Sequence, residues 1–374
     1  MKRNMLTNLI LLVISVFCVL LLSEFLFFRF ILRPSDILKL DFVNSVIKYA
    51  PNQKGIYRKA SEIKANYSIN NNGWNSAHTH YDTKKDTGKY RIAVIGDSFV
   101  EALQVSFNES FAEKLESKLG KDSFDVYRFG ISGAPLSQYL HLIRKEVTQF
   151  KPDLLVILLT HNDFVESFKK VDGVYTSCFL KIYIENGKVI GEIQPKKLDR
   201  KWYHFIREKS AIWRYFVYRK GIRFNNLRKL ILGGTVTGNE SYQANIDITE
   251  IFDYINEIEV LTDYIFNEVK KYCYQKKMEV VIIMDGYRNI IYQGIDSKAY
   301  YDRGALQLNK IAHKFCTKYD IKFIDLHKVF ESDYKRNKQM FNFKNDAHWN
   351  GYGHQIASET LYKMIFFEKD KELK

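Results

Sequence analysis

Residues of the types needed for acyl transfer stand at two distant places in this sequence. Ser98 follows an apolar run that ends in Gly96-Asp97, and a buried strand of this kind delivers a hydroxyl group to the carboxyl edge of a sheet. Much later in the chain, Asp346 precedes His348 by two residues. A serine hydroxyl is a weak nucleophile at neutral pH, so it needs an imidazole to take its proton and a carboxylate to orient that imidazole. The pattern predicts an esterase-type nucleophile, base and acid.

The next two apolar runs end in groups that suit a developing oxyanion. One runs into Phe129-Gly-Ile-Ser-Gly133, where a backbone N–H can approach a bound oxygen without a Cβ in the way. The other runs into Thr160-His-Asn-Asp163, which places the amide of Asn162 at the same edge. The alternative interpretation makes Ser98 a helix N-cap, Gly133 an ordinary turn glycine and Asn162 the cap of the next segment.

These blocks resemble the SGNH (GDSL) hydrolase superfamily, whose members carry Ser, Gly, Asn and His in four blocks. The likeness extends from Arg91 to about Phe366. The segment Tyr67-Ser-Ile-Asn-Asn-Asn-Gly-Trp74 is similar to the lead-in of membrane-anchored bacterial members. The motif Asp-x-His-Trp-Asn-x-x-Gly is similar to that of relatives of the alginate-acetylation proteins, which move acetyl groups on exopolysaccharide.

The resemblance implies a role for each of the residues above. It makes Ser98 the nucleophile, His348 the base and Asp346 the group that orients the base. It also implies an oxyanion hole formed by the backbone N–H groups of Ser98 and Gly133 and the side chain of Asn162.

The sequence departs from the superfamily pattern at two points. The acid is often three residues before the histidine, whereas here the spacing is two, so Asn345 and Asp346 compete as partners of His348. The third block reads Thr160-His-Asn-Asp163 where Gly-x-Asn-Asp is common, which predicts a different local turn.

Apolar runs and amphipathic stretches alternate from Arg91 onward. The expected buried strands are 92–95, 124–129, 154–159, 280–284 and 323–326. Helical patterns lie at 107–119, 137–149, 248–276 and 302–318, and a last helix begins near Gly351. This alternation predicts a three-layer α/β/α domain of the flavodoxin-like type with a parallel sheet.

We expect a signal anchor at 1–33, a lead-in segment at 34–90 and the hydrolase domain at 91–374, with an insertion at about 164–246. In the insertion, Glu185-Asn-Gly187 predicts a hairpin between 180–184 and 188–193. A basic and aromatic stretch follows, from Lys196 to Arg228. It is either a solvated cationic helix pair or a cap beside the active edge that contacts anionic headgroups or glycan.

The N-terminal segment is apolar enough to cross a membrane. Lys2 and Arg3 precede an apolar run from Leu9 to Leu22, and through Phe30 the segment approaches the roughly 20 residues that a span requires. Because no small-x-small cleavage site follows, an uncleaved single-pass anchor is favoured over a removed signal peptide. Basic residues flank both sides and do not fix the orientation, so the expectation of an extracytoplasmic catalytic domain rests on the resemblance.

The composition is that of a basic globular protein. The chain has 374 residues, is 46% hydrophobic and carries a formal net charge of +14, which favours anionic partners. Nothing resembles a nucleic-acid-binding motif, so nucleic acid is not an expected partner. The cysteines show no metal spacing, and His78 and His80 have no evident third ligand, so we expect no cofactor or metal.

These observations predict ester chemistry on an O-acylated cell-envelope glycan or lipid. An O-acyltransferase of surface polysaccharide with the same three residues is the alternative, because the sequence does not say whether water or a sugar hydroxyl takes the acyl group. A non-catalytic, polysaccharide-binding envelope protein is a further alternative. The sequence gives no indication of the oligomeric state.

Overall fold

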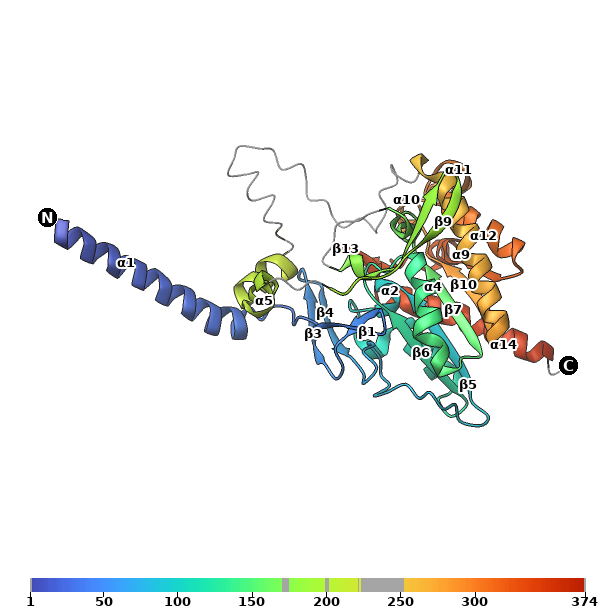
Figure 1. The fold of residues 1–374 in the computed structure, drawn as a ribbon, viewed down its shortest axis with the longest axis horizontal. Coiled ribbons are helices and arrows are strands. Elements are labelled where there is room, and N and C mark those ends of the chain that lie inside the picture. Colours follow the sequence, from blue (N-terminus) through green and yellow to red (C-terminus); the bar gives the residue numbers. More distant parts are fainter. Residues whose placement is uncertain (1, 170–174, 199–201, 221, 223–251, 373–374) are drawn as a thin grey trace. The chain divides into compact units, whose positions relative to one another are not determined.

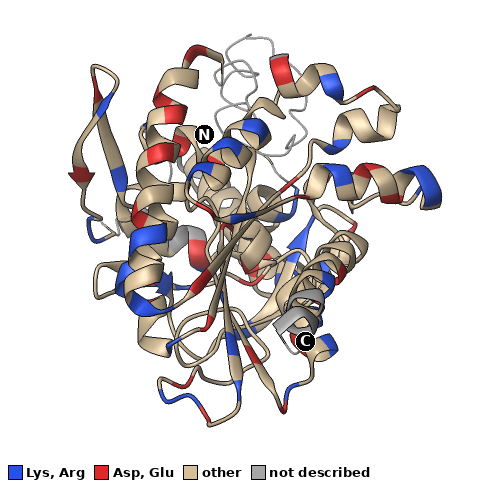
Figure 2. Cartoon of the chain, turned by 90° about the vertical axis from the view of Figure 1, so that its right-hand side faces the viewer, with Lys and Arg blue, Asp and Glu red and all other residues tan. Residues whose placement is uncertain are grey.

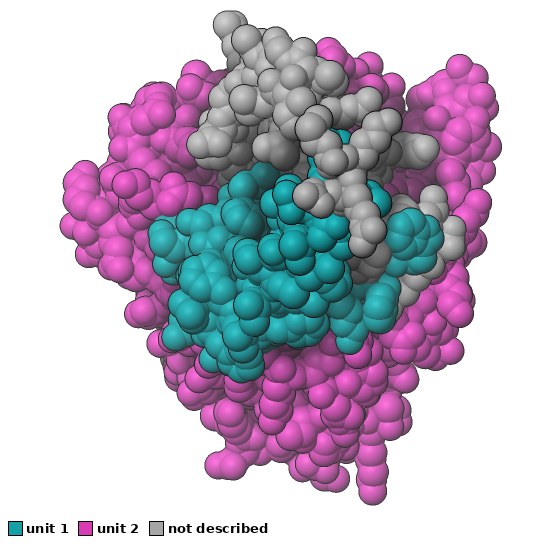
Figure 3. Space-filling model, turned by 90° about the vertical axis from the view of Figure 1, so that its left-hand side faces the viewer, with its two compact units in different colours: residues 1–37, 56–64, 199–239 teal, residues 38–55, 65–198, 240–374 magenta. Residues whose placement is uncertain are grey.

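The computed structural model describes the chain except for residues 1, 170–174, 199–201, 221, 223–251 and 373–374 (Figure 1). The chain divides into two compact units (Figure 3). Unit 1 consists of residues 1–37, 56–64 and 199–239, and unit 2 consists of residues 38–55, 65–198 and 240–374. The insertion predicted at 164–246 therefore belongs partly to each unit, and its residues 223–246 lie outside the described part.

Unit 2 is built on a five-stranded sheet. Its strands are β5 (Tyr90–Gly96), β6 (Phe124–Gly130), β7 (Leu154–Leu159), β10 (Glu279–Met284) and β11 (Lys322–Asp325). They are all parallel, in the order β11-β10-β7-β5-β6. This order is the flavodoxin-like one, in which the direction of winding reverses between the first and third strands, here β5 and β7. The predicted fold class is confirmed.

Helices cover both faces of this sheet. They include α3 (Phe111–Leu119), α4 (Leu136–Lys145), α9 (Ile255–Lys276), α12 (Gln307–Lys318), α13 (Leu326–Asn337) and α14 (Gly351–Glu372). Alternate residues of a strand point to opposite faces, so Leu155 and Ile157 of β7 pack with α4, α9 and α12. Val156 and Leu158 pack with α3, α13 and α14 on the other face. Strands buried on both sides explain the unbroken apolar runs in the sequence.

Two local predictions have different outcomes. The hairpin in the insertion is confirmed, as β8 (Lys181–Glu185) pairs with β9 (Lys188–Ile193), and Asn186 and Gly187 both have positive φ. The helix expected at 302–318 is interrupted. Helix α11 (Lys298–Arg303) ends at Gly304, whose backbone is extended, and α12 begins only at Gln307.

Opposite charges are interspersed over the surface helices of unit 2 (Figure 2). Lys314 and Lys318 of α12, for example, lie 2.9 and 2.6 Å from Glu259 and Asp263 of α9. Exposed ion pairs of this kind contribute little to stability, so the packing of α9 against α12 rests mainly on the apolar side chains beneath them.

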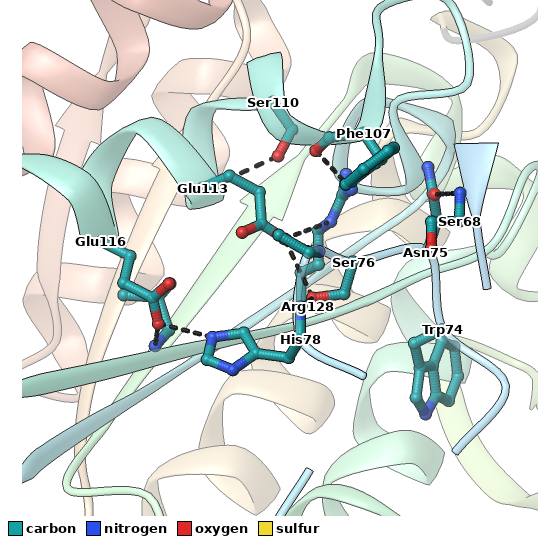
Figure 4. A network of polar contacts seen from close by, with 12 residues as sticks. Ser68, Trp74, Asn75, Ser76, His78, Phe107, Ser110, Glu113, Glu116 and Arg128 are labelled. Carbon is teal, nitrogen blue, oxygen red and sulfur yellow. Dashed lines mark hydrogen bonds and ion pairs between the residues drawn. The ribbon is translucent and has the colours of Figure 1, made fainter. Parts of the chain in front are cut away.

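The segment before the sheet forms two hairpins and then a polar connection to the core of unit 2. The hairpins are β1 (Leu40–Val43) with β2 (Val46–Tyr49) and β3 (Lys54–Lys59) with β4 (Ile63–Ser68). After β4, Ser76 donates to Glu113 of α3 at 2.9 Å, and His78 Nε2 lies 2.6 Å from Glu116 (Figure 4). The Arg128 guanidinium of β6 lies 3.6 Å from Glu113.

Unit 1 contains the N-terminal helix α1 (Lys2–Leu22), which continues as a π-helix over Ser23–Ile31. Residues Met5–Ile31 are long and apolar enough to cross a membrane, a property that an N-terminal signal sequence shares. The unit also contains α5 (Trp202–Lys209), α6 (Ala211–Arg214) and a π-helical turn, η7 (Tyr215–Arg219).

Candidate active site

Ser98 begins the short helix α2 (Ser98–Glu101) directly after β5. The Asp97 carboxylate caps this helix by accepting the N–H of Phe99 at 2.9 Å. The helix packs closely on the end of β6, because a Cβ at Gly130 would lie 2.1 Å from the backbone nitrogen of Glu101. Glycine at 130 therefore permits the approach that fixes the position of Ser98.

His348 lies on the short strand β13 (Asp346–Trp349), which pairs with β12 (Asn342–Phe343). Its Nε2 is 2.7 Å from Ser98 Oγ, and its Nδ1 is 2.5 Å from Asp346 Oδ1. With the Nδ1 proton donated to the carboxylate, Nε2 is left as the acceptor for the serine hydroxyl. This arrangement has the geometry that a general base and its orienting acid require.

The two-residue spacing places Asp346 and His348 on the same side of β13, because side chains alternate along a strand. Asp346 is 3% exposed, and its Oδ1 also accepts the backbone N–H of His348 at 2.9 Å. Asn345, the competing partner in the sequence, is exposed. The structure brings Asp346, and not Asn345, to the imidazole.

Asn162 follows β7 on a 3₁₀ turn over His161–Asp163. Its Oδ1 accepts a hydrogen bond from the Thr160 hydroxyl at 2.9 Å, and its side chain also hydrogen-bonds to the Glu166 carboxylate. Burial raises the pKa of Glu166 to about 7, and in its ionised form this carboxylate accepts one of the two amide hydrogens of Asn162, which keeps the other. Thr160, the departure from the superfamily pattern, forms a capping box with Asp163, whose carboxylate accepts the Thr160 N–H at 2.7 Å.

Gly133 has a φ of +71°, a left-handed conformation that favours glycine. The adjacent Ser132 donates its backbone N–H to Glu101 Oε1 at 3.1 Å and its hydroxyl to Glu101 Oε2. The Tyr49 hydroxyl donates to Glu101 Oε1 as well. Because Glu101 is the last residue of α2, it connects the helix that carries Ser98 to the loop that carries Gly133. Burial raises the pKa of Glu101, although these hydrogen bonds counteract it.

Comparison with protein families found a match for the part of the chain that contains Ser98. Residues 92–197 match the family described as GDSL-like Lipase/Acylhydrolase. This part of the chain is a GDSL-like acylhydrolase domain. The match includes Ser98, Gly133 and Asn162 and establishes the coarse function of the protein, that of an ester-hydrolysing enzyme. Comparison with curated protein sequences found no match.

Several solved esterase structures are similar to the chain at low sequence identity. The acetyl xylan esterase AlAXEase is 13% identical, with a TM-score of 0.40 over 74% of this chain and 99% of its own. A catalytic mutant of Axe2, an acetylxylan esterase from Geobacillus stearothermophilus, is 12% identical, with a TM-score of 0.40 over 75% and 95% of the two chains. A two-domain esterase, CEX, active on acetylated mannans, is 11% identical, with a TM-score of 0.40 over 76% and 50%. Likenesses this distant do not indicate the substrate of the acylhydrolase domain.

A second cluster of polar contacts holds β13 in place. Trp349 Nε1 donates to Asp285 Oδ1 at 2.9 Å, and Asp285 follows β10 at the same sheet edge as Ser98. Arg288 forms an ion pair with Asp285 and donates from Nη2 to the carbonyl of Ala347 at 2.6 Å. Ala347 stands between the acid and the imidazole, so this cluster fixes the backbone that presents both.

Glu101, Asp285 and Arg288 were not predicted from the sequence. Two signals were available in the sequence. Glu101 stands one helical turn after Ser98, which places a carboxylate beside the expected nucleophile. Asp285 directly follows a predicted buried strand, the position that also singled out Asn162 and Ser98.

Two other histidines, His161 and His354, are buried and lie outside the hydrogen bonds described above that connect Ser98 to Asp346. His161 Nε2 lies 3.0 Å from Asn309 Oδ1, and burial lowers the pKa of His161 to about 4. Burial also lowers the pKa of His354 to about 3. Both imidazoles are therefore neutral at physiological pH. Within the described ranges of the chain, no group of three or more His, Cys, Asp or Glu side chains is arranged to hold a metal ion.

Proposed function

We propose that the acylhydrolase domain cleaves acyl esters through Ser98, His348 and Asp346. The observation that carries the proposal is the continuous pair of contacts from Ser98 Oγ to His348 Nε2 and from His348 Nδ1 to Asp346 Oδ1. Ser98 attacks the ester carbonyl while His348 takes its proton, and the imidazolium, stabilised by Asp346, returns the proton to the leaving alcohol. Water then attacks the acyl-enzyme by the same route and regenerates the serine.

The proposed oxyanion hole consists of the backbone N–H groups of Ser98 and Gly133 and the side-chain amide of Asn162. Ser98 is the first residue of α2, and the N–H groups of a first helical turn have no acceptor within their own helix. The Asn162 oxygen is occupied by Thr160, which orients the amide nitrogen as the group available to substrate. The contacts of Glu101 with Ser132 support a fixed position for the Gly133 loop.

The proposed substrate is an O-acylated glycan or lipid of the cell envelope. The support is the apolar N-terminal helix, which is long enough to hold the enzyme at a membrane, together with the resemblance to membrane-anchored members of the superfamily. Product analysis decides between hydrolysis and transfer, because a hydrolase releases the free acid and a transferase delivers the acyl group to an added sugar acceptor.

The direct test combines labelling with turnover of p-nitrophenyl acetate. A fluorophosphonate probe is expected to add its mass to the peptide that contains Ser98. The substitutions Ser98→Ala and His348→Ala should each lower kcat by on the order of 10⁴-fold or more while the circular dichroism spectrum is unchanged. Ser123→Ala, at an exposed serine, is the matched control and should keep full activity. Wild-type turnover in either site variant, or labelling of another serine, would rule out the proposed nucleophile and base.

A further inference from the structure

Within unit 1, the helical segment 210–219 packs on the residues that directly follow the apolar helix α1. The Glu24 carboxylate accepts the N–H of Ala211 at 2.6 Å, the N–H of Ile212 at 3.0 Å and the hydroxyl of Ser210 at 3.0 Å. The first turn of α6 is thus capped by a carboxylate of the N-terminal helix, which supplies acceptors for its otherwise unpaired N–H groups.

Further contacts extend this packing along the segment. Arg214 donates to the carbonyl of Ser35 at 3.0 Å, and Arg219 donates to the carbonyl of Arg33 at 3.2 Å. The Phe28 ring lies 5.3 Å from the Tyr215 ring, measured between centroids. Residues 210–219 and 24–35 therefore lie at one level along the axis of α1, and α5 precedes them at the end of that helix (Figure 1).

The length of α1 sets the depth of this level in a bilayer. The apolar helix covers Met5–Ile31, and its stretch before the first charged residue, Met5–Leu22, is about 27 Å long at about 1.5 Å per residue, close to the roughly 30 Å of a hydrocarbon core. The following π-helical turn contains Glu24 and Arg29, which form an ion pair at 3.1 Å. Charged side chains of this kind belong at the headgroup level, where water and phosphate solvate them.

The outer surface of α5, α6 and η7 combines exposed aromatic rings with exposed lysines. Trp202 is 76% exposed, Phe205 63% and Tyr218 42%, and Lys209 and Lys220 are also exposed. Tryptophan and tyrosine concentrate at membrane interfaces, because their rings are apolar while their polar atoms stay hydrated. Lysines in the same layer attract anionic headgroups.

We propose that residues 202–220 form an interfacial foot that lies on the bilayer beside the end of the N-terminal span. Trp202 and Phe205 enter the boundary between headgroups and acyl chains, and Lys209 and Lys220 contact lipid phosphates. The continuity of the foot with the apolar helix, through Glu24 and Phe28, favours the bilayer as its partner over a glycan. The proposal concerns attachment to the membrane and does not depend on the ester chemistry.

The test uses the full chain in lipid nanodiscs that contain lipids brominated on the upper part of the acyl chain. Bromine quenches nearby tryptophan, so a fraction of the emission should be lost relative to discs without bromine. This quenched fraction should be smaller in Trp202→Phe and should disappear in the double variant Trp202→Phe, Trp213→Phe, because Trp213 is half-buried in the same segment. It should persist in Trp74→Phe, the matched control, because Trp74 is fully buried in unit 2.

A second measurement addresses the lysines and the alternative partner. With anionic lipid in the disc, quenching of Trp202 should increase, and the double variant Lys209→Gln, Lys220→Gln should lose that increase. Equal quenching in Trp202→Phe and the wild type would overturn the proposal. A change in Trp202 emission on addition of acetylated oligosaccharide, without any quenching by brominated lipid, would overturn it in favour of a glycan-binding cap. Neither readout involves turnover, so failure of the proposed esterase activity leaves the result interpretable.

Discussion

Among the individual residues of the site, the charge of Asp346 is expected to matter more than its shape. Asp346→Asn keeps the size of the side chain but removes the charge that stabilises the imidazolium, so kcat should fall by roughly 10³–10⁴-fold. The matched change Asn345→Ala removes an exposed amide and should change kcat less than about two-fold. Both values come from the kinetics of p-nitrophenyl acetate hydrolysis. A larger loss of kcat in Asn345→Ala than in Asp346→Asn would show that Asp346 is not the acid.

Glu101 is expected to act as a positioning residue for the Gly133 loop. Glu101→Ala removes the acceptor of both Ser132 hydrogen bonds and should lower kcat by about 10–100-fold. This decrease in kcat is no larger than the decrease expected when one oxyanion donor is removed. KM should change little, because an oxyanion contact is made in the transition state and not with bound ester. Glu101→Gln keeps an acceptor oxygen and should recover part of kcat. Equal loss in both variants, or a change confined to KM, would argue against a positioning role.

At this same scale, residue type and position predict Ser98, Asn162, Asp346 and His348 as candidates, because each follows an apolar run or stands beside its partner in sequence. The position of Glu101 one helical turn after Ser98 is also visible in the sequence, but its role is not. Its importance depends on Tyr49, which is 52 residues away, and on a loop that meets it only in the folded sheet. A buried carboxylate and an exposed one look the same in a sequence.

The contact between His78 of the lead-in segment and Glu116 of helix α3 contributes a stability that depends on pH. Burial disfavours the charged form of His78, but its hydrogen bond to Glu116 and the charge of that carboxylate outweigh burial, so the pKa of His78 is raised above 6.5. A histidine whose pKa is raised in the folded state stabilises the fold through its protonated form. This stabilisation is complete at pH values below the unfolded pKa of about 6.5, and it is lost as the pH rises through the folded pKa.

We therefore expect His78→Gln to lower the free energy of unfolding by about 1 kcal/mol at pH 5.5 and by clearly less at pH 8.5. Urea denaturation at the two pH values measures the difference. His80→Gln is the control, because the side chains of His80 and Asp82 are both mostly exposed and the substitution should change the free energy of unfolding by less than about 0.5 kcal/mol. A loss at His78 that is independent of pH would contradict the assigned role of the imidazolium.

The elements themselves were predictable to different degrees. The strands of the sheet were predictable, because burial on both faces leaves uninterrupted apolar runs. The β8–β9 hairpin was also predictable, because Asn-Gly adopts the positive φ values of its turn. The association of residues 210–219 with residues 24–35 was not. It rests on contacts between segments that are about 180 residues apart, such as Glu24 with Ala211, and local patterns do not encode such pairs.

On the scale of the whole molecule, the division into units predicts where the chain tolerates truncation. Unit 2 begins at residue 38, so a protein that starts at Lys39 keeps Tyr49, Ser76 and His78 with their partners. It should be soluble and should hydrolyse p-nitrophenyl acetate within about three-fold of the full chain in detergent. A protein that starts at Arg91 loses all three side chains and should be unstable and nearly inactive.

The full chain should remain in the membrane pellet through high-salt and carbonate washes, because a span of about 20 apolar residues is not displaced by either treatment. Immunodetection in pellet and supernatant gives the distribution. Release by carbonate would contradict an integral anchor, and a shortened N-terminus by mass spectrometry would identify a cleaved signal sequence instead.

The contact between Ser98 and His348 joins residues that are 250 positions apart. Closing a loop of that length costs about 5 kcal/mol of chain entropy, and contacts with such separation tend to form late in folding. During refolding from urea, the far-UV signal of the helices and the burial of the sheet should therefore return before esterase activity does. Recovery of esterase activity would then mark the last step of folding, since no shorter-range structure can assemble the proposed catalytic pair.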